Sequence, residues 1–157
     1  YWIEVLGSSK AAGGAALTVM FAAGGISTLI GGHLADRFGA IKIVRIGWAL
    51  LVPLLFLFTR VTHPVIAMVC IVFIAYGLFT VTTPMIILGQ KYLPGRLGFA
   101  SGVTLGLGVS IGGMVAPLVG KYADLNGLVA AMRLLVIVPV LGTLVTLTLR
   151  RPAADKA

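Results

Sequence analysis

Five long stretches of the chain are almost free of charged residues, at about 11–34, 43–58, 64–88, 98–119 and 128–149. A bilayer core about 30 Å thick needs roughly 20 mainly apolar residues in an α-helix, so each stretch is a candidate span. Strands of a membrane barrel would alternate apolar with polar residues over about 10 positions, and these stretches do not. The sequence therefore predicts an all-α, polytopic membrane helix bundle of about five transmembrane helices, with short loops that make neighbouring helices antiparallel.

Composition excludes the main alternatives. Hydrophobic residues make up 59% of the chain and charged residues only 10%, whereas a soluble domain carries about 25% charged residues. The net charge of +8 could indicate a nucleic-acid partner. The basic residues lie singly or in pairs between apolar runs, however, and form no continuous stripe. We therefore expect the lipid bilayer, and no nucleic acid, as the surroundings of this chain.

The opening residues, 1–7, do not resemble a signal peptide, because no basic start precedes an apolar core. They are typical of the end of a preceding helix, and we expect the chain to be a fragment of a longer polypeptide. Cys70 is the single cysteine, so no disulfide can form within the chain.

The distribution of basic residues predicts the orientation in the membrane. One side of the predicted bundle carries eight of them, namely Arg37, Lys42, Arg45, Lys91, Arg96, Arg150, Arg151 and Lys156. The other side carries four, namely Lys10, Arg60, Lys121 and Arg133. Basic residues concentrate on the cytoplasmic side of membrane proteins. The richer side, with the tail 150–157, is therefore predicted to be cytoplasmic, and the membrane to be a cell (inner) membrane.

Glycine is abundant, with 21 residues, and its spacing is helical. In the first run, glycine pairs fall at 13/14, 24/25 and 31/32, which places them on one face. The fourth run carries Gly98, Gly102 and Gly106 four residues apart. Small residues at such spacing let helices approach closely in lipid. These glycine faces have two possible explanations. They either pack a tight, static bundle or provide surfaces that slide past each other during transport. Four prolines can also kink their helices, namely Pro53, Pro84, Pro117 and Pro139.

The segment 32–42, Gly-His-Leu-Ala-Asp-Arg-Phe-Gly-Ala-Ile-Lys, joins the first two runs. A carboxylate at the membrane boundary can face a helix N-terminus or a basic side chain and form a contact that opens with conformation. A polar loop that merely ends the first helix is the alternative. The pattern resembles the signature loop of the major facilitator superfamily, apart from Ile41 where that family has a second basic residue. The resemblance implies a gating loop made of Gly32, Asp36, Arg37, Gly39 and Lys42.

That family has twelve helices in two six-helix halves, with a signature loop in each half. The resemblance therefore implies that residues 1–149 are part of the C-terminal half, with the five runs equivalent to helices eight to twelve. The segment 90–127 further resembles fosmidomycin resistance proteins and related drug-efflux members. Within it, a degraded antiporter motif is implied, with Ala116 and Lys121 in place of glycines. The expected helix-packing glycine motif comprises Gly102, Gly106, Gly112, Gly113, Pro117 and Gly120.

The sequence contains no paired carboxylates, metal-ligand cluster or nucleotide-binding loop. We therefore expect no enzyme activity, no cofactor and no metal. His33 fits a helix-end or packing role better than a proton relay. Uncharged polar residues within the runs are candidates for a substrate path, although each hydroxyl can instead bond its own helix. They are Thr18, Ser27, Thr28, Tyr76, Thr80, Thr82, Thr83, Thr104 and Ser110.

The resemblance to the major facilitator superfamily and its drug-efflux members implies a secondary-active transporter that exports a small molecule or drug by proton antiport. A charge at the bilayer centre is costly and usually functional, and no run carries an acidic residue near its middle. The proton-coupling carboxylate is therefore expected in the missing N-terminal half of the same polypeptide. Three alternatives stay open: an uptake symporter for a small organic anion or sugar, a half-size transporter that forms a homodimer, and a non-transporting membrane scaffold.

Overall fold

The computed structural model describes residues 1–149, and every regular element among them is an α-helix. The helices are α1 (Lys10–Phe38), α2 (Ala40–Phe58), α3 (Pro64–Thr80), α4 (Thr82–Tyr92), α5 (Leu97–Asn126), α6 (Leu128–Leu135) and α7 (Ile137–Thr148). α3 with α4, and α6 with α7, each form one bent span. The described part of the chain thus holds five spans long and apolar enough to cross a membrane. The predicted all-α architecture is confirmed.

The two bends have the same chemical cause. Val81 separates α3 from α4 and lies three residues before Pro84, and Val136 separates α6 from α7 and lies three residues before Pro139. Proline has no N–H, so the carbonyl four residues earlier loses its helical partner and the helix breaks there. For Pro84 that carbonyl belongs to Thr80. The other two prolines lie inside α2 and α5 without interrupting the helix.

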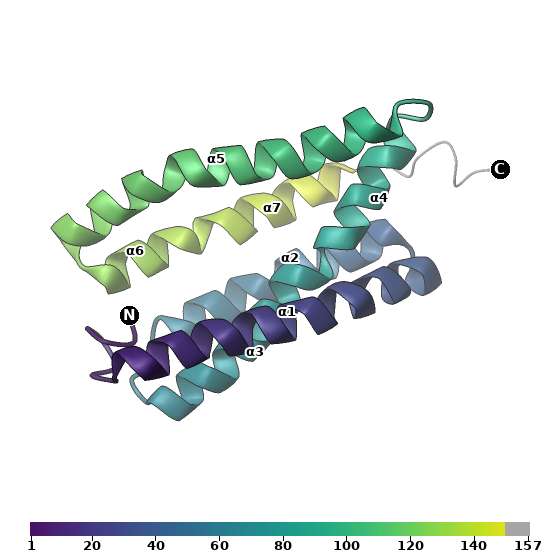
Figure 1. The fold of residues 1–157 in the computed structure, drawn as a ribbon. Coiled ribbons are helices and arrows are strands. Elements are labelled where there is room, and N and C mark those ends of the chain that lie inside the picture. Colours follow the sequence, from purple (N-terminus) through teal and green to yellow (C-terminus); the bar gives the residue numbers. More distant parts are fainter. Residues whose placement is uncertain (150–157) are drawn as a thin grey trace.

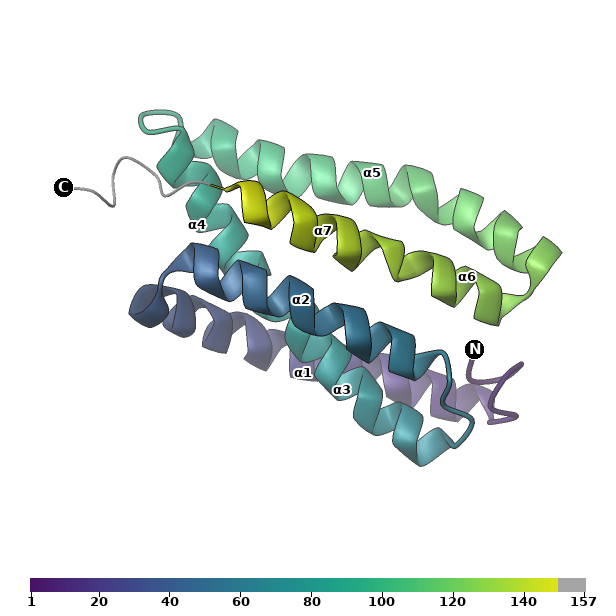
Figure 2. The same ribbon diagram turned by 180° about the vertical axis from the view of Figure 1, so that it is seen from behind.

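The helices form two groups joined by α4. Figures 1 and 2 show α1, α2 and α3 side by side, while α4 leaves this group and crosses toward α5. α7 packs on α2, and α5 contacts α4 near one end and α6 near the other. The α1–α2 corner, the α4–α5 connection and the end of α7 lie at the same end of the bundle (Figure 1).

Two glycines of α1 explain its close packing on α3. A methyl group at Gly24 would lie 2.6 Å from the ring of Phe79, and one at Gly31 would collide with the carbonyl oxygen of Thr80. Gly24 and Gly31 are buried together with Ser27, which lies between them on the same face. The carbonyl of Thr80, which has no helical partner because of Pro84, lies against the backbone of α1 at Gly31. A weak Cα–H···O contact can form there.

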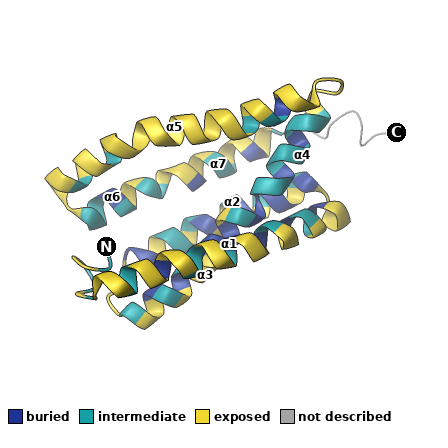
Figure 3. Cartoon of the chain, viewed as in Figure 1, coloured by how far each residue is buried: buried dark blue, intermediate teal, exposed yellow. Residues whose placement is uncertain are grey.

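The glycines of α5 lie in open space. No described atom comes within 4 Å of the position that a side chain would take at Gly102, Gly106, Gly112, Gly113 or Gly120. Ala100 is the one buried residue of this helix, and Figure 3 shows α5 exposed along most of its length. Pro117 is exposed as well. The helix-packing role of this motif therefore stays a prediction, since no described helix covers the face.

Candidate functional site

The signature segment folds as a corner in which a single residue links two long helices. α1 continues to Phe38, beyond the run that ended near residue 34 in the sequence, and α2 begins at Ala40. Gly39 between them has a φ of 92°, a conformation that favours glycine, and its N–H donates to the carbonyl of Ala35 at 2.9 Å. Asp36 and Arg37 thus lie in the last turn of α1, where a loop was expected.

Asp36 lies at the edge of a hollow that α4 completes. The hollow has a volume of about 360 Å³ and is lined by Asp36, Gly39, Ile87 and Lys91, among others. Asp36 is exposed and has no hydrogen bond or ion pair with any residue in the range 1–149. A carboxylate on α1 and an ammonium group on α4 therefore share one water-accessible space at the end of the bundle.

Gly39 also lines this hollow, whereas the other expected gating residues, Gly32, Arg37 and Lys42, do not. The guanidinium of Arg37 lies 5.4 Å from the ring centre of Phe38. Gly32 packs against α4, because a methyl group there would lie 3.4 Å from Cγ2 of Thr83. Lys42 is exposed and borders a different hollow.

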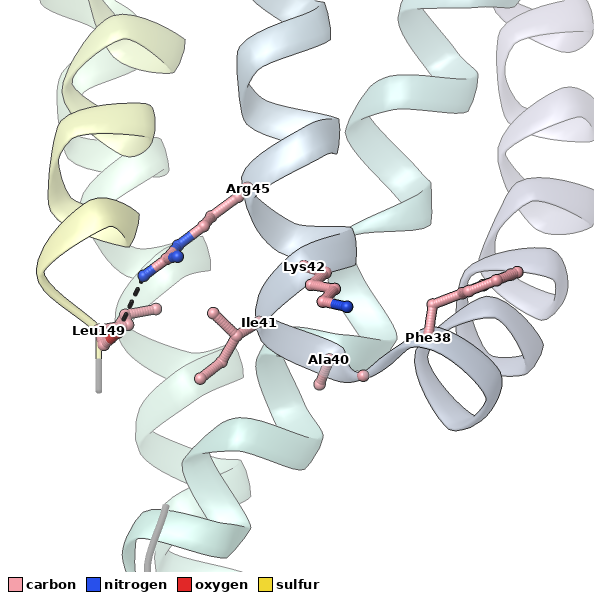
Figure 4. A pocket seen from close by; sticks show the side chains of 7 residues that line it. Phe38, Ala40, Ile41, Lys42, Arg45 and Leu149 are labelled. Atoms are coloured by element: carbon pink, nitrogen blue, oxygen red, sulfur yellow. Dashed lines mark hydrogen bonds between the residues drawn. The ribbon is translucent and has the colours of Figure 1, made fainter. Parts of the chain in front are cut away.

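Arg45 is a structural residue of the corner that the motif did not indicate. Its Nε donates to the carbonyl of Thr146 at 2.9 Å, and its Nη2 donates to those of Leu147 at 3.2 Å and Leu149 at 3.0 Å. Figure 4 shows the side chain reaching from α2 to the end of α7. Unpaired carbonyls give a helix C-terminus a partial negative charge, which a cation neutralises. The sequence feature that could have indicated this role is the position of Arg45 as a single basic residue just inside the second apolar run.

Four of the predicted substrate-path hydroxyls meet where α1 crosses the α3–α4 bend. Thr80 donates to the carbonyl of Ser27, and Thr83 donates to that of Thr28, both at 3.4 Å. Ser27 and Thr28 themselves donate to carbonyls one turn back in α1, at 2.6 and 2.9 Å. Each hydroxyl hydrogen is thus engaged with backbone, which favours a packing role over ligand binding in this conformation.

The remaining candidates do not join this cluster. Thr18 and Ser110 are exposed on α1 and α5. Tyr76 borders an apolar hollow of about 70 Å³ between α1, α2 and α3. Thr82 is half-buried at the start of α4. Thr104 donates to the carbonyl of Ala100 in its own helix, at 2.8 Å.

A polar contact that the sequence did not indicate joins α4 to α5. Nε2 of Gln90 donates to Oγ of Ser101 at 2.8 Å. Next to it, a methyl group at Gly89 would lie 2.6 Å from Oγ1 of Thr104. A side-chain hydrogen bond and a glycine contact therefore fix the two helices together near their connection.

In the part of the chain that the structure describes, no three His, Cys, Asp or Glu side chains come together as metal ligands do. His33 is exposed near the end of α1, and Cys70 is buried in α3.

Within residues 1–149, five helical spans long and apolar enough to cross a membrane, with charged residues gathered at one end of the bundle, are typical of a polytopic membrane protein. The family model of the Major Facilitator Superfamily matches residues 1–157, and the chain belongs to this family. The protein called Uncharacterized MFS-type transporter YfnC, from Bacillus subtilis (strain 168), is 34% identical to it over 121 residues. That alignment covers 77% of this chain and 29% of the relative, so the part of the chain that matches spans less than a third of the relative's length. No solved structure is significantly similar.

Proposed function

We propose that residues 1–149 form part of the C-terminal half of a secondary-active transporter that exports a small molecule by proton antiport. The supporting observation is the corner at Gly39, which places Asp36 of α1 and Lys91 of α4 at one hollow. In this proposal the bundle lies in the inner membrane with the corner and the tail 150–157 on the cytoplasmic side. The preceding half of the polypeptide supplies the coupling carboxylate and the other wall of the substrate path.

The hollow supports a gating role because its two charged residues belong to helices that can change their separation. Opposite charges about 4 Å apart attract by about 4 kcal/mol at an effective dielectric constant near 20, and much less when water separates them. Closure of α4 onto α1 would therefore stabilise one conformation, and hydration of the hollow would release it.

The bend at Val81 supplies the place where α4 can move. α3 is held against α1 by the glycine contacts at Gly24 and Gly31. Beyond the bend, α4 contacts α1 at its start through Thr83 and is bonded to α5 through Gln90. A helix broken by proline can change its angle at lower cost than a continuous helix. We propose that α4 and α5 move as one unit about Val81 and that this motion contributes to alternating access.

Export is proposed over uptake because the segment 90–127 resembles drug-efflux members and because the polar residues within the spans are almost all uncharged hydroxyls. A path of this kind suits apolar, varied substrates. The uptake symporter for a small organic anion or sugar is the second candidate within transport. Drug-susceptibility profiles of cells that express the complete protein, compared with growth on single carbon sources, distinguish the two.

The gating proposal is tested with Asp36→Asn in the complete transporter, reconstituted in vesicles with an imposed pH gradient. We expect lower flux with unchanged membrane insertion, because the amide keeps the size of the side chain but not its charge. Asp124→Asn is the matched control, since Asp124 is an exposed carboxylate near the end of α5 and at the opposite end of the bundle. Normal flux in Asp36→Asn would refute the gating role. Absence of flux in the unmodified protein for every compound tested would favour the scaffold alternative.

A further inference from the structure

A second hollow, of about 300 Å³, lies between the α1–α2 corner and the end of α7. Among residues 1–149 its walls are residues 38–42, Arg45 and Leu149; two of these described side chains are cationic and none is acidic. It differs from the hollow of Asp36, although both border Gly39 and Ala40. A hollow at the end of three spans whose described charged side chains are all cationic is a candidate site for an anion.

Lys42 and Arg45 both have N–H donors that can still bind further acceptors. A guanidinium carries five N–H donors. The three bonds of Arg45 to α7 use its Nε and Nη2, which leaves the two donors of Nη1 without an acceptor among residues 1–149. The ammonium of Lys42 has no hydrogen-bond partner in the same range. Figure 4 shows Arg45 directed toward Leu149 and Lys42 directed toward Phe38, so the cations flank the hollow on two sides.

The surface beside the hollow is suited to a hydrocarbon chain. Ile46 and Leu50 follow Lys42 at intervals of four residues, which places all three on one face of α2. Both are exposed, at 63% and 43%. They also border the apolar hollow of about 70 Å³ that Tyr76 lines, deeper in the membrane. A basic side chain above an exposed apolar stripe matches a molecule with an anionic head and an acyl tail.

We propose that this hollow binds the phosphate group of an anionic phospholipid, with Lys42 and Arg45 at the headgroup and one acyl chain along Ile46 and Leu50. The start of α2 at Ala40 has no side-chain cap, and its partial positive charge adds to the field. Basic pockets between helices at the cytoplasmic surface are suited to such headgroups. A phosphate in solution offers the same anionic group without the chains, and the experiment separates the two sources.

The test uses the complete transporter, purified in a neutral detergent, with phosphatidylglycerol added in steps and the bound lipid counted by native mass spectrometry. Lys42→Gln is expected to weaken phosphatidylglycerol binding about fivefold. Ile41→Lys adds a cation at the wall of the hollow and is expected to strengthen it by a similar factor. Lys10→Gln is the control, because Lys10 is exposed at the other end of α1, and it should change nothing.

Two further measurements complete the test. Phosphatidylcholine has no net charge, so its binding should be weaker and unaffected by Lys42→Gln. Glycerol phosphate carries the anionic group without acyl chains and should compete only at far higher concentration. Equal phosphatidylglycerol binding by the unmodified protein and both corner variants would overturn the proposal, as would competition by glycerol phosphate at the concentration of the lipid. Binding is measured without a gradient or a substrate, so failure here would leave the proposed transport activity untouched.

Discussion

The contact between Gly31 and Thr80 gives the sharpest test of the fold. A methyl group at Gly31 would collide with the carbonyl oxygen of Thr80 and would lie 2.8 Å from the Cα of that residue. The obstacle is backbone, which cannot rotate away as a flexible side chain can. Gly31→Ala must therefore push α1 away from the α3–α4 bend.

The expected magnitude follows from two opposing terms. Overpacking a tight site costs about 1–3 kcal/mol, whereas glycine to alanine within a helix gains about 1 kcal/mol of helix propensity. Gly25→Ala isolates the second term, because Gly25 lies in the same helix with nothing within 4 Å of the added methyl group. We expect Gly31→Ala to be less stable than Gly25→Ala by about 1–3 kcal/mol.

The assay is reversible unfolding of the complete transporter in mixed detergent micelles, followed by circular dichroism. Because the helix-propensity terms cancel between the two variants, their difference measures the helix contact itself. Equal unfolding free energies for Gly31→Ala and Gly25→Ala would refute the packing argument. A flux measurement on the same samples then shows whether loosening the contact also changes transport.

Three smaller effects can be measured on the same protein. Arg45→Gln should lower the free energy of unfolding by about 1–2 kcal/mol, because three carbonyls at the end of α7 lose a charged donor; Arg37→Gln, whose guanidinium contacts one ring, should change it far less. Ser101→Ala should cost about 0.6 kcal/mol, typical of a hydrogen bond between membrane helices, and should cost nothing further when Gln90 is already alanine. Burial raises the pKa of Tyr1 above its ordinary value of 10.0. The neutral phenol is therefore favoured in the folded protein, so its contribution to stability is present below pH 10 and is lost as pH rises through the raised pKa; tyrosinate absorbance that titrates at the ordinary value, judged against Tyr1→Phe, would contradict this.

The number and type of the spans could be predicted from the sequence because the apolar runs are local and long. The packed face of α1 could also be anticipated, since glycine spacing sets which residues share a face. The ends of the helices were harder to predict than their number. α1 continues to Phe38 because a helix can extend past its apolar run into polar residues. The helix breaks near Pro84 and Pro139 but not at the two other prolines, so the presence of proline alone does not predict a break.

Only part of the candidate site could be predicted from the sequence. Local spacing identified the corner, but Arg45 binds carbonyls at the end of α7 that are 101 to 104 residues away, a separation that no motif encodes. Four hydroxyls chosen for their residue type meet at one crossing, while Thr18 and Ser110 lie apart, because residue type does not reveal the neighbouring helix. The roles of Asp36 and of the α5 glycines stay predictions.

The bond from Arg45 to Thr146 also has a consequence for synthesis of the protein. Its partners are made 101 residues later, which corresponds to about 5–20 s at a translation rate of about 5–20 residues per second. During that interval α2 can already lie in the bilayer, while the α7 carbonyls do not yet exist. The guanidinium must then be solvated by headgroups or water at the membrane surface, so the α2–α7 contact can form only as the last helix of the described chain arrives.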